Sequence, residues 1–490
     1  MYRIAEQNLL SWHQEGTRKP LIIRGARQVG KSTLVRNFAK NTKLTLYEIN
    51  LERYPKLENV FASFDIKLII RELSAILKNE IILENSILFL DEIQITPSAI
   101  QALRYFYEEL PSLAVIAAGS LLEFVLADHN FSMPVGRVEY LHLYPMSFEE
   151  FLLAKQENYL LGLIKNYSWQ EDIAQGAHSQ LFNFFREYLI VGGMPEAVKV
   201  FVESQNLEKV NKVHDSIIAT YQDDFGKYAK NKDLLRLHNI FNYVPRAIGE
   251  KIKYVNISRE DQAREMKFAI DLLSKARVIT KSYHSDCSGI PLSVDINTNV
   301  YKLFFLDVGL ANRICGLSWI DVIKLDELRL INEGAIAEQF IAQHLLLNRR
   351  SYEQPNLFYW LREQKSVNAE VDFVTNIGKE IVPIEVKSGK SGTLKSLMQF
   401  VYTKKAKYGV RFDLNLPSIQ EINHLLKQEK EVVEVKYKLL SLPLYLVGQL
   451  QRLYMQANED IKDKDSIEGF EAKNDKNKAE FYSFDEIIKG

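Results

Sequence analysis

Residues 25–33 carry side chains that could bind a nucleotide. The run Gly25-Ala26-Arg27-Gln28-Val29-Gly30-Lys31-Ser32 fits the pattern G-x-x-x-x-G-K-[ST], in which glycines let backbone N–H groups wrap phosphates. Lys31 would reach the β- and γ-phosphates, the Ser32 hydroxyl would ligate Mg²⁺, and the helix opening at Thr33 adds its positive dipole end. The pattern predicts a site for a nucleoside triphosphate. A plain glycine turn between a strand and a helix is the alternative.

Two acids that follow an apolar run would complete this site. Ile87-Leu88-Phe89-Leu90 ends abruptly in Asp91 and Glu92. Strands buried on both faces read as continuous apolar runs, and ligands bind at their carboxyl ends. Asp91 is therefore placed to hold Mg²⁺, usually through water, and Glu92 to orient the attacking water. With Lys31 they form a predicted catalytic set for ATP hydrolysis, and two acids at a solvated strand end are the alternative.

A further apolar run, residues 113–118, ends in Gly119 and Ser120. A polar side chain at this strand end would sense the γ-phosphate or would simply cap the next helix. The sequence leaves both roles of Ser120 open.

A strand–turn–strand pattern near the C-terminal end presents a second group of charged side chains. Residues 370–374 alternate polar and apolar, residues 376–379 suit a turn, and residues 381–387 form the returning strand. With the turn centred between positions 377 and 378, Asp372 lies opposite Pro383. A proline in a strand implies an edge or a bulge, which weakens this register.

In that register Glu385 and Lys387 point to the same face as Asp372. Diagonal neighbours on one face have Cα atoms about 7–8 Å apart, so the two carboxylates could share a divalent cation. Oxygen ligands suit Mg²⁺ or Mn²⁺, and Lys387 would orient or activate a water. The alternative is a surface hairpin whose acids pair with lysine. Glu338 lies upstream, at the margin of the apolar face of a predicted helix.

Composition limits the class of protein. A length of 490 residues predicts roughly two to four domains. The net charge of −1 argues against a wholly basic nucleic-acid coat but allows local patches. The two cysteines, Cys287 and Cys315, imply no disulfide framework, so we expect a cytoplasmic protein. The longest apolar region, residues 113–127, is broken by polar residues and predicts no membrane span.

Changes of pattern divide the chain into five predicted parts. Strands alternate with helices through residues 1–151, which predicts a three-layer α/β P-loop ATPase core. Residues 152–230 read as a helical lid, in which Gly192-Gly193-Met194-Pro195 would break a helix and could act as a hinge. Residues 231–325 suit a winged-helix-like unit, residues 326–456 a further α/β unit, and residues 457–490 a tail that does not pack.

The strands expected in the core are 21–23, 44–51, 87–90, 113–118 and 138–143, and those expected in the winged-helix-like unit are 277–284 and 300–306. The basic residues of this unit are interleaved with acids, so a packing module and a DNA reader both fit: Arg246, Lys251, Lys253, Arg264 and Lys267.

Several motifs together resemble a large, poorly characterised prokaryotic family of AAA-type ATPases with a C-terminal restriction-endonuclease-like domain. Besides residues 25–32, the matching blocks are 90–94 (LDEIQ), 118–122 (AGSLL), 136–138 (GRV), 143–151 (LYPMSFEEF), 192–197 (GGMPEA), 301–310 (YKLFFLDVGL) and 442–446 (LPLYL). The resemblance covers almost the whole chain up to about Leu453.

This resemblance implies roles for further residues. Glu338, Asp372, Glu385 and Lys387 match the acid, D and E-x-K positions of the PD-(D/E)-x-K nuclease fold, although Val371 replaces the proline that names the motif. Arg137 matches a position where an arginine would complete the ATP site of a neighbouring subunit in a homo-oligomer, and a structural ion pair is the alternative.

The combined prediction is a multidomain α/β protein that binds ATP and Mg²⁺, hydrolyses ATP and acts on nucleic acid through a metal-dependent nuclease-like domain. The competing prediction is a nucleotide-gated switch or scaffold whose nuclease-like domain binds a partner without cutting, since a fold match does not establish activity.

Overall fold

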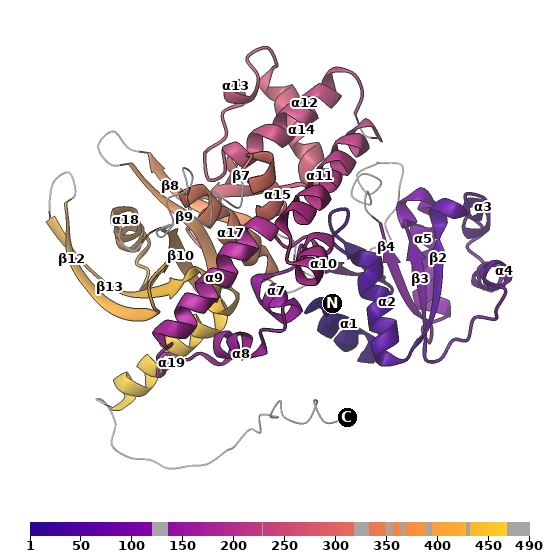
Figure 1. Cartoon of the computed structure of the whole chain (residues 1–490), viewed down its shortest axis with the longest axis horizontal. Helices are drawn as coiled ribbons and strands as arrows, with labels where there is room; N and C mark the ends of the chain where they lie inside the picture. The colour runs from indigo at the N-terminus through magenta and orange to yellow at the C-terminus, as the bar shows by residue number, and fades with distance from the viewer. Residues whose placement is uncertain are drawn as a thin grey trace.

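The computed structural model of the chain describes residues 1–119, 136–227, 229–317, 333–348, 353, 356–363, 368–387, 389, 394–427 and 432–467. The N-terminal core, a central group of helices and a large curved sheet follow one another across the molecule (Figure 1). No helix among the described residues is long and apolar enough to cross a membrane.

The N-terminal core is a five-stranded parallel sheet in the order β2-β3-β4-β1-β5. Its strands confirm the five predicted runs: β1 (Leu21–Arg24), β2 (Thr45–Asn50), β3 (Ser86–Asp91), β4 (Ala114–Ala118) and β5 (Glu139–His142). Alternate residues of β1 enter two separate apolar clusters, with Leu21 and Ile23 in one and Ile22 in the other. Because both faces of the sheet are covered, the core has three layers. The covering helices are α1 (Ala5–Gln14), α2 (Lys31–Thr42), α3 (Leu57–Phe61), α4 (Ile66–Leu77) and α5 (Pro97–Glu109).

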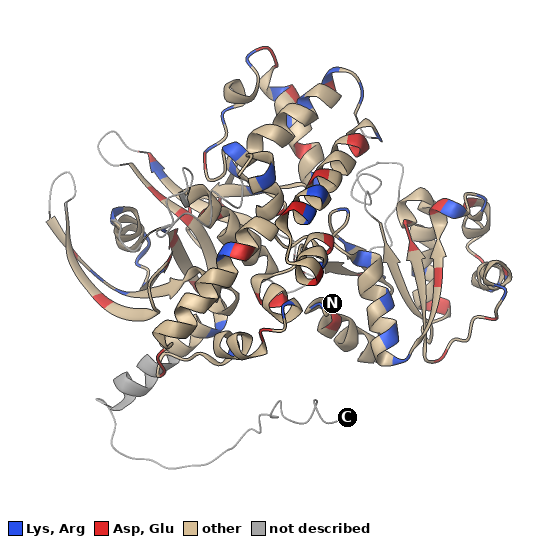
Figure 2. Cartoon of the chain, in the orientation of Figure 1, with Lys and Arg blue, Asp and Glu red and all other residues tan. Residues whose placement is uncertain are grey.

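Helices fill the centre of the molecule. In chain order they are α7 (Phe148–Ala154), α8 (Asn158–Asn166), α9 (Gln175–Val191), α10 (Pro195–Ser204), α11 (Leu207–Asp224), α12 (Lys232–Tyr243), α13 (Tyr254–Ile257), α14 (Ala263–Lys275) and α15 (Val308–Ile314). Short 3₁₀ turns occupy Leu51–Arg53, Ile93–Ile95, Phe225–Lys227, Val244–Arg246 and Leu444–Gln449. Figure 2 shows basic and acidic residues interspersed along these helices.

The second sheet has eight strands in the order β12-β13-β11-β10-β9-β8-β6-β7. They are β6 (Ile279–Ser285), β7 (Ile296–Phe305), β8 (Leu357–Glu363), β9 (Asn368–Ile377), β10 (Glu380–Val386), β11 (Tyr408–Asp413), β12 (Ser418–Lys427) and β13 (Val432–Pro443). Three helices accompany the sheet: α17 (Glu333–Leu347), α18 (Lys395–Lys404) and α19 (Leu450–Ile467). Helix α17 packs against β7, β8 and β10.

The two strands predicted for the winged-helix-like unit form as expected but belong to this second sheet. Strand β6 pairs with β7 on one side and runs parallel to β8 on the other, with Ser282 opposite Leu357. The sheet therefore crosses the boundary predicted at 325/326, and the winged-helix-like unit over 231–325 is not separate. A hairpin at a sheet edge and a free wing have the same period-two pattern, so sequence did not distinguish them.

The hairpin of β9 and β10 has a different register from the predicted one. Its turn is Gly378-Lys379, because Ile377 pairs with Glu380, and Pro383 therefore lies opposite Val374 instead of Asp372. The paired ladder ends at Ile384 and Phe373, so Asp372 and Glu385 follow directly after its last pair, on neighbouring strands. The shift is by two positions, so the predicted face is retained while the two carboxylates come closer.

Pro383 lies in an inner strand and not at an edge, contrary to its predicted position. Pairing of β10 with β11 begins only at Ile384, one residue later. The missing N–H of Pro383 therefore interrupts no hydrogen bond to β11.

The Gly192-Gly193 pair ends α9, as predicted, and packs closely against a buried acid. Asp307 Oδ2 accepts a hydrogen bond of 2.6 Å from the Gly193 N–H, and a Cβ on Gly192 would lie 2.1 Å from Asp307 Oδ1. Close approach therefore explains the glycines, and their action as a hinge stays a prediction. Helix α19 continues to Ile467, past residue 457, where the tail was predicted to begin; residues 468–490 lie outside the described residues. A helix already formed at 450–456 is extended more easily than a new one is started.

Candidate functional sites

The phosphate-binding loop joins β1 to α2, as predicted. Gly30 has a φ of 93° and stands as the N-cap of α2, a conformation that favours glycine. The Lys31 ammonium is buried within the loop, where Nζ donates to the carbonyl oxygens of Gly25 at 3.0 Å and Ala26 at 2.8 Å. Burial lowers the pKa of Lys31 to about 8, and the nearby carboxylates of Glu92 and Asp91 oppose that shift. The ammonium is thus held beside the backbone that would wrap the phosphates.

The acids after β3 meet the loop at the carboxyl end of the sheet. The Ser32 hydroxyl donates a hydrogen bond of 2.9 Å to Asp91 Oδ2, so the two predicted Mg²⁺ ligands lie together. Burial raises the pKa of Asp91, and the Ser32 hydrogen bond lowers it. Glu92 accepts a hydrogen bond of 2.6 Å from the Gln94 amide, which orients its carboxylate. Two neighbouring oxygen donors fit the needs of Mg²⁺.

Three side chains that the sequence analysis did not identify contact the phosphate-binding loop from distant parts of the chain. Arg3 is described first, and Tyr221 and Asp224 of α11 follow. Arg3 donates to Val29 O at 2.9 Å and to Tyr144 O at 2.7 Å, and its Nε pairs with Glu150 Oε1 at 3.0 Å. The sequence signal nearest to this contact is the pattern Ser147-x-x-Glu150, which forms a capping box at the start of α7.

The end of α11 contacts the loop at Arg27. The Tyr221 hydroxyl donates to Arg27 O at 2.6 Å, and Asp224 Oδ2 pairs with the Arg27 guanidinium at 2.6 Å. Asp224 Oδ1 also contacts Lys227 at 2.7 Å. The central helices therefore touch the phosphate-binding loop directly, through both its backbone and a side chain. No local pattern in the sequence predicts the contact between α11 and the phosphate-binding loop.

Replacing Tyr221 by Phe should weaken ATP binding. The change removes one hydrogen bond to the loop backbone, which contributes about 1 kcal/mol net, so the Kd should rise about fivefold. Titration with a fluorescent ATP analogue measures it. Tyr159→Phe, at a side chain that is 75% exposed, is the matched control. An unchanged Kd for Tyr221→Phe would show that α11 does not support the loop.

Arg137 forms the structural ion pair that was its alternative role. Its Nε lies 2.8 Å from Glu108 Oε1, on an exposed surface. A role at the ATP site of a neighbouring subunit stays a prediction. Ser120 falls outside the described residues.

The C-terminal candidates meet where α17 packs on the second sheet. Asp372 Oδ2 accepts a hydrogen bond of 2.8 Å from the Val386 N–H, and Lys387 Nζ lies 2.5 Å from Glu385 Oε1. Glu385 is 5% exposed, and its Oε2 has no hydrogen-bond partner among the described residues. Glu338 reaches this group from α17. The structure thus brings all four predicted residues into one region.

A buried lysine, Lys302 on β7, is the member that the sequence did not reveal. Its ammonium contacts Glu370 and lies 3.8 Å from Glu338 Oε2 and 5.1 Å from the centre of the Tyr359 ring. The sequence analysis placed Lys302 in the winged-helix-like unit and therefore did not group it with these acids. The signal that could have found it is a lysine inside the apolar run of residues 301–306.

Burial dominates the electrostatics of this cluster. It raises the pKa of Glu338 to about 8 and of Glu385 to about 7, in both cases with a further contribution from Asp372. Burial also raises the pKa of Asp372, against the charge of Lys302 and the Val386 N–H. Within the described ranges, no group of three or more His, Cys, Asp or Glu residues has the arrangement of a metal site. Asp372 and Glu385 are the two carboxyl groups of this cluster that could hold a cation between neighbouring strands.

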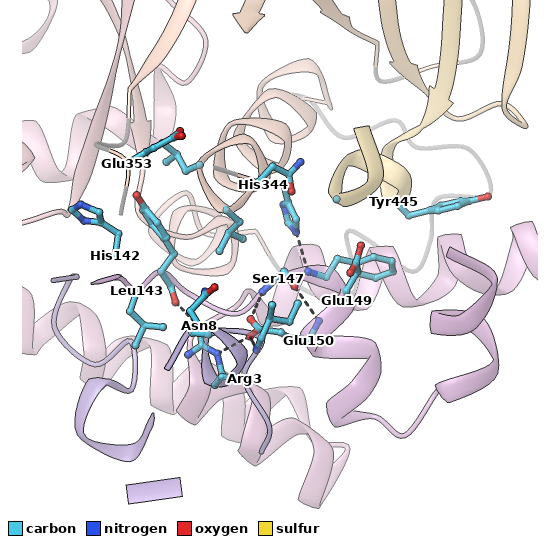
Figure 3. A pocket seen from close by; sticks show the side chains of 18 residues that line it. Arg3, Asn8, His142, Leu143, Ser147, Glu149, Glu150, His344, Glu353 and Tyr445 are labelled. Carbon is cyan, nitrogen blue, oxygen red and sulfur yellow. Dashed lines mark hydrogen bonds and ion pairs between the residues drawn. The ribbon is translucent and has the colours of Figure 1, made fainter. Parts of the chain in front are cut away.

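A cavity of about 260 Å³ lies where the N-terminal segment, α7 and α17 meet (Figure 3). Next to it, His344 Nε2 accepts a hydrogen bond of 2.9 Å from the Phe148 N–H, which links α17 to the end of the ATPase core. Burial lowers the pKa of His344 to about 4, and the neutral ring is the form that can accept this bond.

Acid should therefore destabilise this junction. Because the folded-state pKa of His344 is depressed from about 6.5, its contribution is present above pH 6.5 and is lost as the pH falls toward 4. The loss is roughly 2 kcal/mol at pH 5. Buried acids with raised pKa, such as Asp307, act in the opposite direction, so the comparison of wild type with His344→Gln is informative.

Urea unfolding at pH 7 and pH 5 measures this effect. Between these pH values His344→Gln should lose roughly 2 kcal/mol less of its free energy of unfolding than wild type. The exposed His424→Gln should behave like wild type. Equal losses for wild type and His344→Gln would contradict the depressed pKa.

The parallel sheet, the phosphate-binding loop and the Ser32–Asp91 pair define a P-loop ATPase core. The family comparison agrees, because residues 17–152 match the model of the AAA domain. The chain therefore carries an AAA-type ATPase domain. Residues 183–321 and 333–441 match two models described as domains of unknown function, DUF8612 and DUF4143.

Among solved structures, the chain is similar to a Walker-type ATPase of Pyrococcus abyssi, with 15% identity and a TM-score of 0.40, over 63% of this chain and 94% of that one. It is also similar to the RuvB Holliday junction branch migration motor of Thermotoga maritima (14% identity, TM-score 0.27, 58% and 90% covered) and to AMPPCP-bound DnaA of Aquifex aeolicus (12%, 0.27, 56% and 89%). At this level these structures do not indicate substrates or partners. No curated protein matches the chain.

Proposed function

We propose that the N-terminal core binds and hydrolyses ATP. The observation that supports this most is the Ser32–Asp91 hydrogen bond of 2.9 Å, which joins the predicted Mg²⁺ ligands beside the buried Lys31. A bound Mg²⁺ would neutralise phosphate charge there. Lys31 would hold the β- and γ-phosphates, and Glu92, oriented by Gln94, would align the attacking water.

For the C-terminal sheet we propose a Mg²⁺- or Mn²⁺-dependent site that cleaves phosphodiester bonds of nucleic acid. Support comes from the hairpin, in which Asp372 and Glu385 directly follow the last paired residues of neighbouring strands, with Lys387 2.5 Å from Glu385. The unpartnered Glu385 Oε2 is an oxygen ligand available to a cation. A cation between the two carboxylates would neutralise charge on the phosphate. Lys387 would position the water that attacks phosphorus while the ester P–O bond breaks and its oxygen takes a proton.

The second candidate function is a nucleotide-gated switch or scaffold that binds a partner without cutting. It is favoured by Lys302 and Lys387, whose contacts already neutralise part of the acid cluster. The contact of α11 with the phosphate-binding loop would serve such a switch. In either function, an exposed Arg137 would be available to a second copy of the chain.

A nuclease assay on the purified full chain separates the two candidates. DNA and RNA, single- and double-stranded, are incubated with Mg²⁺ or Mn²⁺, with and without ATP. Cleavage that EDTA abolishes supports the nuclease. Binding of nucleic acid without any cleavage, or no action on it at all, supports the switch or scaffold.

A further inference from the structure

Lys302 lies where a sheet strand curves around α17. Strands β8 and β6 separate β7 from β9 in the sheet, yet Lys302 on β7 contacts Glu370 on β9. The Phe304 and Phe373 rings, also from β7 and β9, lie with their centres 5.3 Å apart. Because the sheet is curved, the Lys302 ammonium lies beside the acids of β9 although two strands separate β7 from β9 in the sheet.

The ammonium of Lys302 is almost fully buried, with 1% of its side chain exposed. Burial alone would lower its pKa, but Glu338 and Glu370 raise it above the ordinary value, so the group stays charged. The Tyr359 ring, 5.1 Å away, also favours a cation here. A permanent positive charge is thus built into the protein at this position.

The contacts divide the cluster into two halves. Lys302 contacts Glu370 and faces Glu338 at 3.8 Å, whereas Lys387 pairs with Glu385 next to Asp372. Four carboxyl groups meet two ammonium groups in this cluster, so the acids outnumber the built-in cations by two. Glu338 Oε2 and Glu385 Oε2 both lack a hydrogen-bond partner among the described residues. Glu338 Oε2 faces the Lys302 ammonium at 3.8 Å, whereas Glu385, a residue that is 5% exposed, is in the half that Lys302 does not contact.

We propose that Lys302 is a built-in cation that takes the place of a second metal ion, so that this site binds a single divalent cation between Asp372 and Glu385. Glu338 then belongs to the Lys302 half and is not a metal ligand. The inference rests on the metal-binding part of the proposed function and adds the number of ions and the residue that sets it. It agrees with the absence, among the described residues, of a group of three acids arranged around one point.

The experiment is Mn²⁺ binding to the full chain without nucleotide, measured by equilibrium dialysis. The Asp372→Asn/Glu385→Gln double variant lacks both proposed ligands, so the Mn²⁺ ions that it still binds are bound elsewhere on the chain. The number of ions bound by wild type minus this number gives the ions bound at this site. Wild type and Lys302→Arg should each bind one Mn²⁺ here. Lys302→Met, which removes the charge at similar length, should bind a second one.

Two ions on wild type, or only one ion on a folded Lys302→Met, would overturn the inference. If Lys302→Met does not fold, Glu338→Gln decides. It should keep one ion with an affinity within about threefold of wild type, and a loss of more than about tenfold would make Glu338 a ligand. No difference between wild type and the double variant would instead overturn the metal site itself, and this inference with it.

Discussion

Replacing Lys31 by Ala is expected to abolish measurable ATP binding at micromolar nucleotide. The ammonium is held on the loop carbonyls of Gly25 and Ala26, where it would meet the β- and γ-phosphates. A fluorescent ATP analogue, titrated into the purified full chain, measures the loss. Lys40→Ala, an exposed lysine on the same helix, should bind like wild type.

Glu92→Gln should bind ATP normally but hydrolyse it about 100-fold more slowly, because a neutral amide replaces the group that aligns and deprotonates the water. Phosphate release under saturating ATP measures the rate, with the exposed Glu84→Gln as control. If Glu92→Gln hydrolyses ATP at the wild-type rate, Glu92 does not align the attacking water.

If Lys31→Ala binds ATP as tightly as wild type, the loop of residues 25–32 is not the ATP-binding site.

Asp372→Ala and Glu385→Ala should each abolish metal-dependent cleavage while ATP hydrolysis stays within about twofold of wild type. The two carboxylates lie on adjacent strands and face one region, so the loss of either leaves one ligand for the cation. The proposed ATP site lies on a different sheet, at Ser32 and Asp91. Cleavage of labelled DNA and RNA and phosphate release, both with Mn²⁺, provide the two measurements.

Lys387→Ala should retain the cation but cut about 100-fold more slowly, since only the group beside the water is lost. Glu421→Gln, at a strand carboxylate whose side chain is 84% exposed, should cut like wild type. Cleavage that survives both carboxylate changes would place the activity elsewhere. A wild-type protein that neither binds a divalent ion in this domain nor cuts would favour the switch or scaffold.

The sequence by itself determined the phosphate-binding loop, the two acids after β3 and the strands around them. Residues 25–32 and the pair Asp91-Glu92 are local patterns, and local patterns are set by backbone geometry that a short segment can specify. The five core strands were predictable because strands buried on both faces are continuously apolar. The shared face of Asp372 and Glu385 also followed from sequence, because alternation has a period of two and tolerates a register shift of two.

Only the tertiary structure decided which distant residues complete the sites. Lys302 meets Glu370 because a sheet curves around α17, and Tyr221 meets Arg27 because α11 packs onto the loop. The placement of β6 beside β8 likewise depends on hydrogen bonds between segments far apart in the chain. Such contacts depend on which apolar faces of helices and sheets are buried against each other and on which strand edges form hydrogen bonds. Neither choice can be read from the local residue pattern of the segments that meet.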